Sequence, residues 1–267
     1  MKTEDQLFTA VVLAADREAD NPVAKAAGVL CKSLAPIGGT AMIFRVLEAL
    51  SSSNRVKDRI LCGPPKTIMD QEPMLSEYVA AGKVDWMENQ PTPSLSALHV
   101  MQSVPEDIPV LLTTSDHALL SPRIVDYFCS EAEKSGCDVV AAVARQETVT
   151  GAYPQTRRTA YRFKDGAYCS CNLFAFLTPR GRAAPSFWRR VEQQRKNPLL
   201  VINALGWNTV MRYLVGSLTL ADAVDRISYR LGCKAGIVIM PFPEAAIDVD
   251  TISDWHFVEQ IAAQTSG

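Results

Sequence analysis

Short apolar runs alternate with segments of helical spacing through the first 145 residues of the chain. The apolar runs are rich in aliphatic and β-branched residues, and turn-forming residues separate them from the segments between. The runs cover residues 8–14, 59–62, 84–87, 108–113 and 138–144. This alternation is typical of βαβ units and predicts an α/β fold with a mostly parallel sheet. Right-handed crossovers then place the carboxyl ends of the strands, and with them any ligand site, along one edge.

The segments between these runs are predicted to be helices. They cover residues 40–50, 70–80, 94–101 and 122–134. Thr40 stands where the N-cap of the first of these helices is expected, and Pro122 occupies the first turn of the last.

The pattern changes from about Gly151 onwards. Residues 159–163 and 167–178 are predicted strands on either side of a Lys164-Asp165-Gly166 turn, which is a hairpin signal. The remaining predicted elements are helices at 182–194, 200–214 and 219–231, a strand at 235–240 and a helix at 252–264. We expect a single domain over residues 1–267. Its sheet-forming half covers about 1–145, a helical and hairpin lobe about 146–235, and a C-terminal strand and helix about 236–267.

Charge and cysteine usage exclude several classes of protein. The chain has 27 Lys and Arg against 29 Asp and Glu, a formal net charge of −2, which argues against a broad nucleic-acid or anionic-membrane surface. The 7 cysteines are scattered, as in reduced cytosolic proteins. The N-terminal apolar run is too short for a signal peptide, and no run is long enough for a membrane span. We expect a soluble, cytoplasmic protein; the oligomeric state cannot be read from the sequence.

The loop that follows the first strand is the first candidate site. It begins Leu13-Ala14-Ala15-Asp16-Arg17, continues to Lys32, and ends in a Gly38-Gly39 turn before a helix. Backbone N–H groups and a lysine in such a loop can offset the charge of a bound triphosphate. The alternative is a surface loop with one solvated lysine.

Carboxylates at two distant places are the second candidate site. Asp116 follows the most apolar strand, and Asp248 and Asp250 stand two residues apart just before the last helix. Mg²⁺ needs only one or two carboxylates in addition to phosphate oxygens and water. The alternative is that Asp116 belongs to a turn before Pro122 and that Asp250 or Thr251 caps the following helix.

Together these motifs resemble the MobA-like NTP transferases. The similarity rests on Leu-Ala-Ala with a loop ending in Lys32, on Gly38-Gly39 and Thr40-Ala41-Met42, on Ser115-Asp116, and on Asp248-Val249-Asp250-Thr251. It spans nearly the whole chain in the right order. It implies a GT-A-type, Rossmann-like three-layer sandwich, with a nucleotide-binding half, an acceptor-side lobe and Mg²⁺ (or Mn²⁺) as cofactor. The sequence departs from the family pattern at Asp16, where relatives usually have glycine.

The resemblance also implies roles for individual residues. Lys32 and Asp116 would be catalytic, and Asp116 would bind the metal with Asp248 or Asp250. The residues expected to contact the nucleotide are Leu13, Ala14, Ala15, Arg17, Lys32, Pro93, Ser94, Ser96 and Ser115. Asn172 is expected on the acceptor side, where relatives line the acceptor pocket. Apart from the resemblance, Arg158 and Lys164 are expected there because they belong, with Arg157 and Arg162, to a basic cluster near the hairpin that suits an anionic group. A solvated hairpin face is the alternative for that cluster.

The predicted activity is therefore Mg²⁺-dependent nucleotidyl transfer. A nucleoside monophosphate would pass from an NTP to a small phosphorylated or hydroxylated acceptor, and pyrophosphate would leave. The resemblance favours CTP or GTP as the donor, with CTP first. Two alternatives stay open: a GT-A glycosyltransferase that uses a nucleotide-sugar, and a nucleotide-binding regulatory module without turnover. Glycosyltransferases of this fold usually have an Asp-x-Asp pair on the central strand, whereas this chain has Ser115-Asp116-His117.

Overall fold

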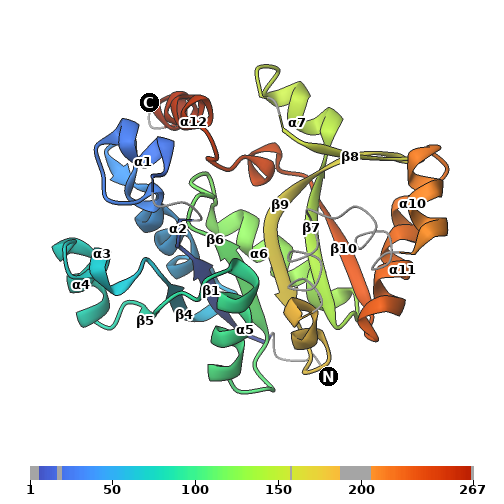
Figure 1. Ribbon diagram of the computed structural model, residues 1–267, viewed down its shortest axis with the longest axis horizontal. Helices are drawn as coiled ribbons and strands as arrows, with labels where there is room; N and C mark the ends of the chain where they lie inside the picture. The colour runs from blue at the N-terminus through green and yellow to red at the C-terminus, as the bar shows by residue number, and fades with distance from the viewer. Residues whose placement is uncertain (1–5, 17–19, 157, 187–205, 266–267) are drawn as a thin grey trace.

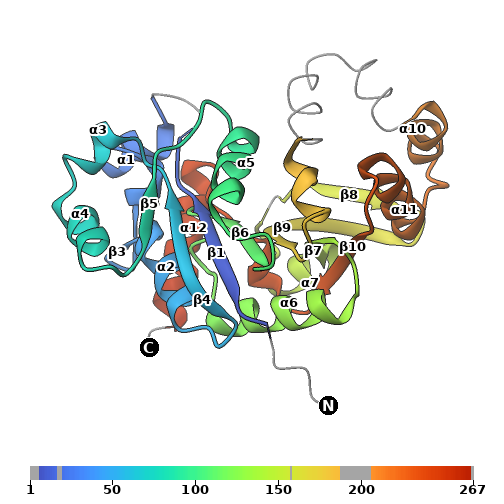
Figure 2. The same cartoon turned by 90° about the horizontal axis from the view of Figure 1, so that it is seen from below.

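A mixed sheet of eight strands runs through the middle of the molecule, with helices on both faces (Figures 1 and 2). The computed structural model describes residues 6–16, 20–156, 158–186 and 206–265. The strands of the sheet are β1 (Phe8–Leu13), β4 (Val56–Cys62), β5 (Asp85–Met87), β6 (Val110–Thr114), β7 (Val139–Arg145), β8 (Ala160–Phe163), β9 (Gly166–Phe176) and β10 (Ala235–Met240). Their order is β10-β7-β9-β6-β1-β4-β5, with β8 paired to β9.

The described helices follow the strands along the chain. They are α1 (Pro22–Ala27), α2 (Met42–Ser51), α3 (Lys66–Met69), α4 (Pro73–Ala80), α5 (Pro93–Ser103), α6 (Pro122–Lys134), α7 (Gln146–Ala152), α10 (Trp207–Leu214), α11 (Leu220–Leu231) and α12 (Ile252–Thr265). Three 3₁₀ turns are η1 (Lys32–Leu34), η2 (Gly181–Ala183) and η3 (Pro243–Ala246).

Strand β1 lies inside the sheet, between β6 and β4, which explains why its sequence is almost entirely apolar. Side chains alternate between the two faces of a strand. Ala10 and Val12 of β1 join the core on the side of α2 and α6, whereas Val11 joins a second core with Val100 of α5. Burial on both faces is typical of a parallel strand between helix layers. The expected three-layer α/β fold with a mostly parallel sheet is confirmed.

Strand β9 runs against its two neighbours. It pairs antiparallel with β6 and with β7, whereas β1, β4, β5 and β6 pair in parallel with one another and β10 pairs in parallel with β7. The register of β9 against β7 shifts between Ala141 and Val143. Asn172 lies at this irregularity and has a φ of 48°, in the left-handed region that few residues other than glycine adopt.

Several sequence predictions need correction at this level. Thr40 is not an N-cap: it lies in the short strand β3 (Thr40–Ala41), which pairs with β2 (Pro36–Ile37). Gly38 and Gly39 form the turn between them with φ of 59° and 79°, as a tight hairpin of the I′ type requires. Helix α2 therefore begins at Met42 after Ala41, which has no capping group.

Two predicted helices also differ from the structure. The helix predicted at 70–80 begins only at Pro73, as α4, because proline fits the first turn of a helix; the short helix α3 that precedes it was not predicted. Residues 146–152 form α7, which the sequence reading left without an element. The helices predicted at 182–194 and 200–214 lie partly outside the described residues; what is described there is η2 and α10. Among the described residues, no helix is long and apolar enough to cross a membrane.

Candidate active site

Lys32 stands between two carboxylates that come from distant parts of the chain. Its Nζ lies 2.5 Å from Oδ2 of Asp116 and 3.4 Å from Oδ1 of Asp250. The Lys32 and Asp116 side chains are only 15% and 14% exposed, whereas Asp250 is 65% exposed. The ion pair between Lys32 and Asp116 is thus shielded from water, and Asp250 lies on its solvent-exposed side.

The main chain holds these carboxylates together. Asp116 stands two residues after the end of β6, and its Oδ1 accepts a hydrogen bond from Oγ1 of Thr114 at 2.5 Å. The N–H of Val249 donates to the main-chain oxygen of Asp116 at 3.0 Å. This bond joins the segment 248–250 to the end of β6. The two predicted carboxylate regions therefore converge at the carboxyl edge of the sheet, where a ligand site is expected.

Lys32 and Asp116 stabilise each other in their charged forms. Burial opposes the charged form of Lys32, but the adjacent Asp116 and Asp250 outweigh it and raise the pKa of Lys32. Burial likewise disfavours the Asp116 carboxylate, but Lys32 and the Thr114 hydroxyl hold its pKa below the ordinary value. Both groups are therefore charged at neutral pH.

Asp248 is held away from Lys32 by other partners. Its carboxylate forms an ion pair with Arg158, and its Oδ2 accepts a hydrogen bond from Nδ2 of Asn172 at 2.5 Å. Arg158 also donates to the main-chain oxygen of Asp248 at 3.0 Å. Within the described part of the chain, no three His, Cys, Asp or Glu side chains come together as a metal-binding group. Of the three predicted metal ligands, Asp116 and Asp250 meet at Lys32, and Asp248 does not.

The predicted acceptor-side residues are only partly grouped. Arg158 lines a pocket of about 320 Å³ together with Tyr161 of β8, Ser170 of β9 and the segment of Asp248 and Asp250. Its charge already faces Asp248, and Asp254 lies 3.9 Å away. Lys164 is exposed in the β8–β9 turn, where its N–H donates to Leu218. Arg157 lies outside the described residues. The expected basic cluster is thus not a set of cations that all face this pocket.

A second pocket, of about 210 Å³, lies beside the loop that follows β1. Of the predicted nucleotide contacts, Leu13, Ala15, Pro93 and Ser96 line it; the other lining residues are Asp16, Cys62, Asn89, Gln90, Pro91 and Thr92. Burial raises the pKa of the Cys62 thiol to about 11, so at neutral pH it forms a neutral wall. Cys62, Asn89 and Gln90 were not among the residues predicted from the sequence. The position of Cys62 at the carboxyl end of β4 is a signal that could have identified it.

The remaining predicted nucleotide residues lie around this pocket. Ala14 is buried, and its N–H donates to the main-chain oxygen of Cys62 at 2.9 Å. Ser94 is buried in the first turn of α5, and the buried Ser115 donates its N–H to Leu13 at 3.0 Å. Arg17 lies outside the described residues.

Gly63 shapes the same pocket from the end of β4. Its φ is 83°, and a Cβ on it would lie 3.2 Å from the backbone nitrogen of Ala15. The absence of a side chain therefore lets the end of β4 approach the loop after β1.

Asp16 organises the turn that carries Lys32. Its Oδ2 accepts a hydrogen bond from the N–H of Lys32 at 2.9 Å. Lys32 is the first residue of η1, and Cys31 at the N-cap makes no side-chain capping bond. Asp16 thus supplies the cap from a distant position. Burial raises the pKa of Asp16, although the Lys32 N–H opposes this shift.

The Gly38-Gly39 turn does not take part in this arrangement. The N–H of Gly38 donates to Oε1 of Glu259, and Nε1 of Trp255 donates to the main-chain oxygen of Pro36. Both partners belong to α12. The turn therefore anchors the C-terminal helix, and the expectation that it cradles phosphate is not supported by its contacts.

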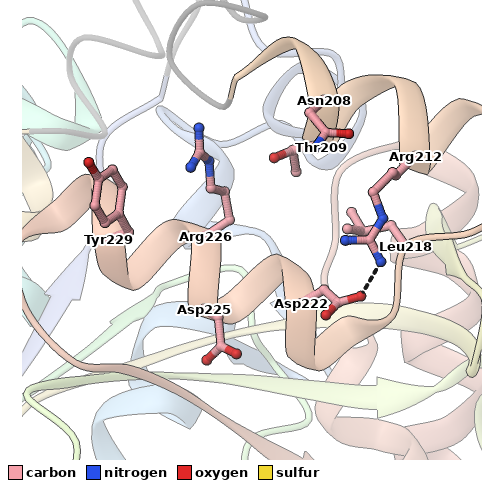
Figure 3. Close-up of a pocket in the computed structure, with 8 residues that line it drawn as sticks. All are labelled: Asn208, Thr209, Arg212, Leu218, Asp222, Asp225, Arg226 and Tyr229. Carbon is pink, nitrogen blue, oxygen red and sulfur yellow. Dashed lines mark hydrogen bonds and ion pairs between the residues drawn. The ribbon is translucent and has the colours of Figure 1, made fainter.

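A third cavity, of about 380 Å³, lies between α10 and α11 (Figure 3). Arg212 of α10 pairs with Asp222 of α11 at 2.5 Å across it. These helices lie at the opposite end of the molecule from α1 (Figures 1 and 2). This cavity is therefore separate from the site around Lys32.

Comparisons with known proteins identify the family and the fold of the chain. The model of the MobA-like NTP transferase domain matches residues 10–226. A hypothetical transferase structure from Thermus thermophilus is 27% identical, with a TM-score of 0.77, and the match covers 94% of this chain and 100% of that one. No curated protein matches the chain with significant sequence similarity.

Two further solved structures share the fold at 13% identity. One is a CMP:2-keto-3-deoxy-manno-octonic acid synthetase complexed with CTP, with a TM-score of 0.55 and coverage of 97% of this chain and 99% of that one. The other is a 4-diphosphocytidyl-2C-methyl-D-erythritol synthase from Anaerococcus prevotii, with a TM-score of 0.57 and coverage of 97% of both chains.

Proposed function

Because the chain belongs to the MobA-like NTP transferase family, we propose that it is a Mg²⁺-dependent nucleotidyltransferase. It transfers a nucleoside monophosphate from an NTP, CTP in the first place, to a small phosphorylated or hydroxylated acceptor and releases pyrophosphate. The seven cysteines all lie in the described ranges and are free thiols, which supports a reducing, cytoplasmic location.

The observation that carries this proposal is the position of Lys32. Its ammonium lies between Asp116 and Asp250, and its main-chain N–H is held by Asp16, which lines the neighbouring pocket. A nucleotide whose base occupies the pocket of Leu13 and Ala15 has its phosphates directed toward this ammonium. A cation and two carboxylates at one end of such a pocket suit a triphosphate and a divalent ion.

Asp116 and Asp250 are the residues that would hold Mg²⁺. Each presents a carboxylate oxygen to the same nitrogen of Lys32, so both carboxylates face one point. Two carboxylates are what Mg²⁺ takes from protein when phosphate and water supply the rest. When bound, the ion neutralises charge on the phosphates. Asp248, bound to Arg158 and Asn172, acts as a support for this segment and not as a ligand.

The chain's own contribution is positioning and charge neutralisation. Lys32 neutralises negative charge on the phosphates as the acceptor oxygen attacks the α-phosphorus in line with the departing pyrophosphate. A phosphate monoester acceptor needs no general base. His117 is unsuited to that role, because burial lowers its pKa to about 4 and the ring is 1% exposed.

Two structural relatives support CTP as the donor in this proposal. One of them is a CMP-sugar-acid synthetase complexed with CTP, and the other is named for a diphosphocytidyl product. We extend cytidylyl transfer to this chain on that basis. The acceptor lies in the pocket of Arg158, Tyr161 and Ser170, on the other side of Asp250.

Pyrophosphate release from each of the four NTPs, with and without Mg²⁺, tests the function against a panel of phosphorylated metabolites and alcohols. We expect release only with Mg²⁺ and fastest with CTP. Asp116→Asn should lower kcat by about 10³-fold or more. Asp58→Asn, at an exposed position of β4, is the matched control and should turn over like the wild type. Release of a nucleoside diphosphate when a nucleotide-sugar replaces the NTP, or NTP binding without turnover on any acceptor, would replace the proposal by one of the two alternatives.

A further inference from the structure

Asp254, in the first turn of α12, holds the main chain of the segment that carries Asp250. Its Oδ2 accepts hydrogen bonds from the N–H of Asp250 at 3.3 Å and from the N–H of Thr251 at 2.9 Å. The same oxygen accepts a hydrogen bond from Oγ1 of Thr251 at 2.8 Å, and that hydroxyl accepts one from the N–H of Asp254 at 3.2 Å. One carboxylate oxygen therefore fixes the backbone at the residue whose side chain reaches Lys32.

The other oxygen of Asp254 faces Arg158, which precedes β8. Oδ1 of Asp254 lies 3.9 Å from Nη1 of Arg158, and the same guanidinium forms an ion pair with Asp248. The Arg158 and Asp254 side chains are 14% and 23% exposed, so water and salt screen this contact less than they screen a surface ion pair. Arg158 therefore limits rotation of the Asp254 carboxylate and keeps Oδ2 on the N–H groups of Asp250 and Thr251.

Asp250 depends on such support because its own side chain is exposed. The carboxylate is 65% exposed and meets Lys32 at 3.4 Å, the longer of the two ion-pair distances at that lysine. Ordering an exposed side chain and its backbone costs conformational entropy each time a cation binds. A main chain that is fixed in advance reduces this cost, so the hydrogen bonds to Asp254 bear directly on cation binding at Asp250.

Helix α11 begins with the same arrangement, and the comparison shows what is particular to α12. Thr219 and Asp222 form a capping box at the start of α11, and Asp222 pairs with Arg212 at 2.5 Å (Figure 3). In that box the carboxylate accepts the N–H of the capping threonine. In α12 it also accepts the N–H of the residue before the cap, which is Asp250. Asp254 therefore combines an ordinary helix cap with a contact to the site around Lys32.

We propose that Asp254 is a positioning residue for the metal site, because it sets the place of the Asp250 carboxylate beside Lys32 and Asp116. The inference rests on the proposed Mg²⁺-dependent function. Asp254 acts through Asp250, since its Oδ2 is occupied by three donors from Asp250 and Thr251 and its Oδ1 faces Arg158. Removing a group that orients a metal ligand typically lowers metal affinity or activity by about 10- to 100-fold.

Electron paramagnetic resonance of Mn²⁺ binding without nucleotide, together with urea unfolding, tests this role. Asp254→Ala should weaken Mn²⁺ binding by about tenfold and lower the urea midpoint of unfolding. The Mg²⁺ concentration for half-maximal pyrophosphate release from CTP should rise by a similar factor. Asp254→Asn keeps an oxygen that accepts the same N–H groups and should keep most of the Mn²⁺ affinity.

Asp222→Ala is the matched control, because it removes the corresponding carboxylate from the capping box of α11, in the separate cavity of Figure 3. It should lower the urea midpoint about as much as Asp254→Ala does. The Mn²⁺ affinity and the Mg²⁺ requirement of the Asp222→Ala protein should equal those of the wild type. A loss of stability alone therefore does not imitate the expected result.

The outcomes separate the inference from the function on which it rests. An Asp254→Ala protein that is folded by circular dichroism and binds Mn²⁺ like the wild type would reduce Asp254 to a helix cap and leave nucleotidyl transfer standing. An Asp254→Asn protein that loses as much affinity as the alanine variant would show that charge and not hydrogen bonding matters, which also overturns the positioning role. A wild type that releases no pyrophosphate from any of the four NTPs and binds no Mn²⁺ would count against the proposed function itself.

Discussion

Replacing Gly63 by alanine tests how closely the end of β4 must approach the loop that follows β1. Gly63 has a φ of 83°, and an added Cβ would lie 3.2 Å from the nitrogen and 3.3 Å from the Cβ of Ala15. Gly82 has a similar φ of 69°, but no described atom would lie within 4 Å of its added Cβ. Both positions therefore require a positive φ, but only at Gly63 would an added Cβ contact Ala15.

The expected magnitudes follow from this difference. An alanine with left-handed φ costs roughly 1–2 kcal/mol at either position. At Gly63 the contact with Ala15 adds about 1–3 kcal/mol, because backbone as well as side chain must shift. Gly82→Ala should therefore lower the free energy of unfolding by about 1 kcal/mol, and Gly63→Ala by about 3 kcal/mol. Because Ala15 lines the pocket, only Gly63→Ala should also weaken CTP binding, by about tenfold.

Urea unfolding of both variants gives the free energies, and calorimetric titration with CTP and Mg²⁺ gives the affinities. Equal losses of stability in the two variants would show that the contact with Ala15 carries no energy. A Gly63→Ala protein that binds CTP like the wild type would refute the link between this approach and the pocket.

Three further perturbations address the ionisable residues. Lys32→Met removes the cation between the carboxylates, so it should abolish turnover. In the absence of nucleotide it should strengthen Mn²⁺ binding severalfold, as measured by electron paramagnetic resonance. Unchanged Mn²⁺ affinity would contradict this expectation. Asp16→Ala should cost about 1 kcal/mol in urea unfolding as a lost cap, and Asp16→Asn clearly less. His117 has a pKa lowered from 6.5 to about 4 by burial, so unfolding takes up a proton between these values. Stability should fall by up to about 3 kcal/mol as pH drops from 6.5 toward 4, and His117→Leu in EDTA should flatten this dependence.

The layer architecture was accessible from the sequence because apolar period and turn residues are local signals. β1 and β6 are recognisable as uninterrupted apolar runs, and α6 by its proline in the first turn. The pairing of β9 with both β6 and β7 has no such local signal. The Gly38-Gly39 turn was misjudged because a glycine pair fits an anion cradle and a tight hairpin equally well; the contact with Glu259, which decides, is distant in sequence.

At the site, too, local sequence signals were sufficient for some residues, whereas others depend on contacts that are distant in sequence. Lys32, Asp116 and the segment 248–250 were identified from motif order, and the structure places them at one edge. The sequence could not separate Asp250 from Asp248, because the difference lies in the partners Arg158 and Asn172, which only the folded chain brings near. Asn89 was missed since an isolated amide in a loop has neither period nor motif.

The antiparallel strand β9 has a consequence for how this chain can be divided. It returns from the lobe to lie between β6 of the first half and β7, and it bonds to both. A fragment that ended near residue 145 would expose a row of unpaired N–H and C=O groups along β6, which invites aggregation. Exchange of residues 146–235 between homologues must therefore carry β9 with it, and the graft must match its main-chain register to β6 at Val110–Leu112.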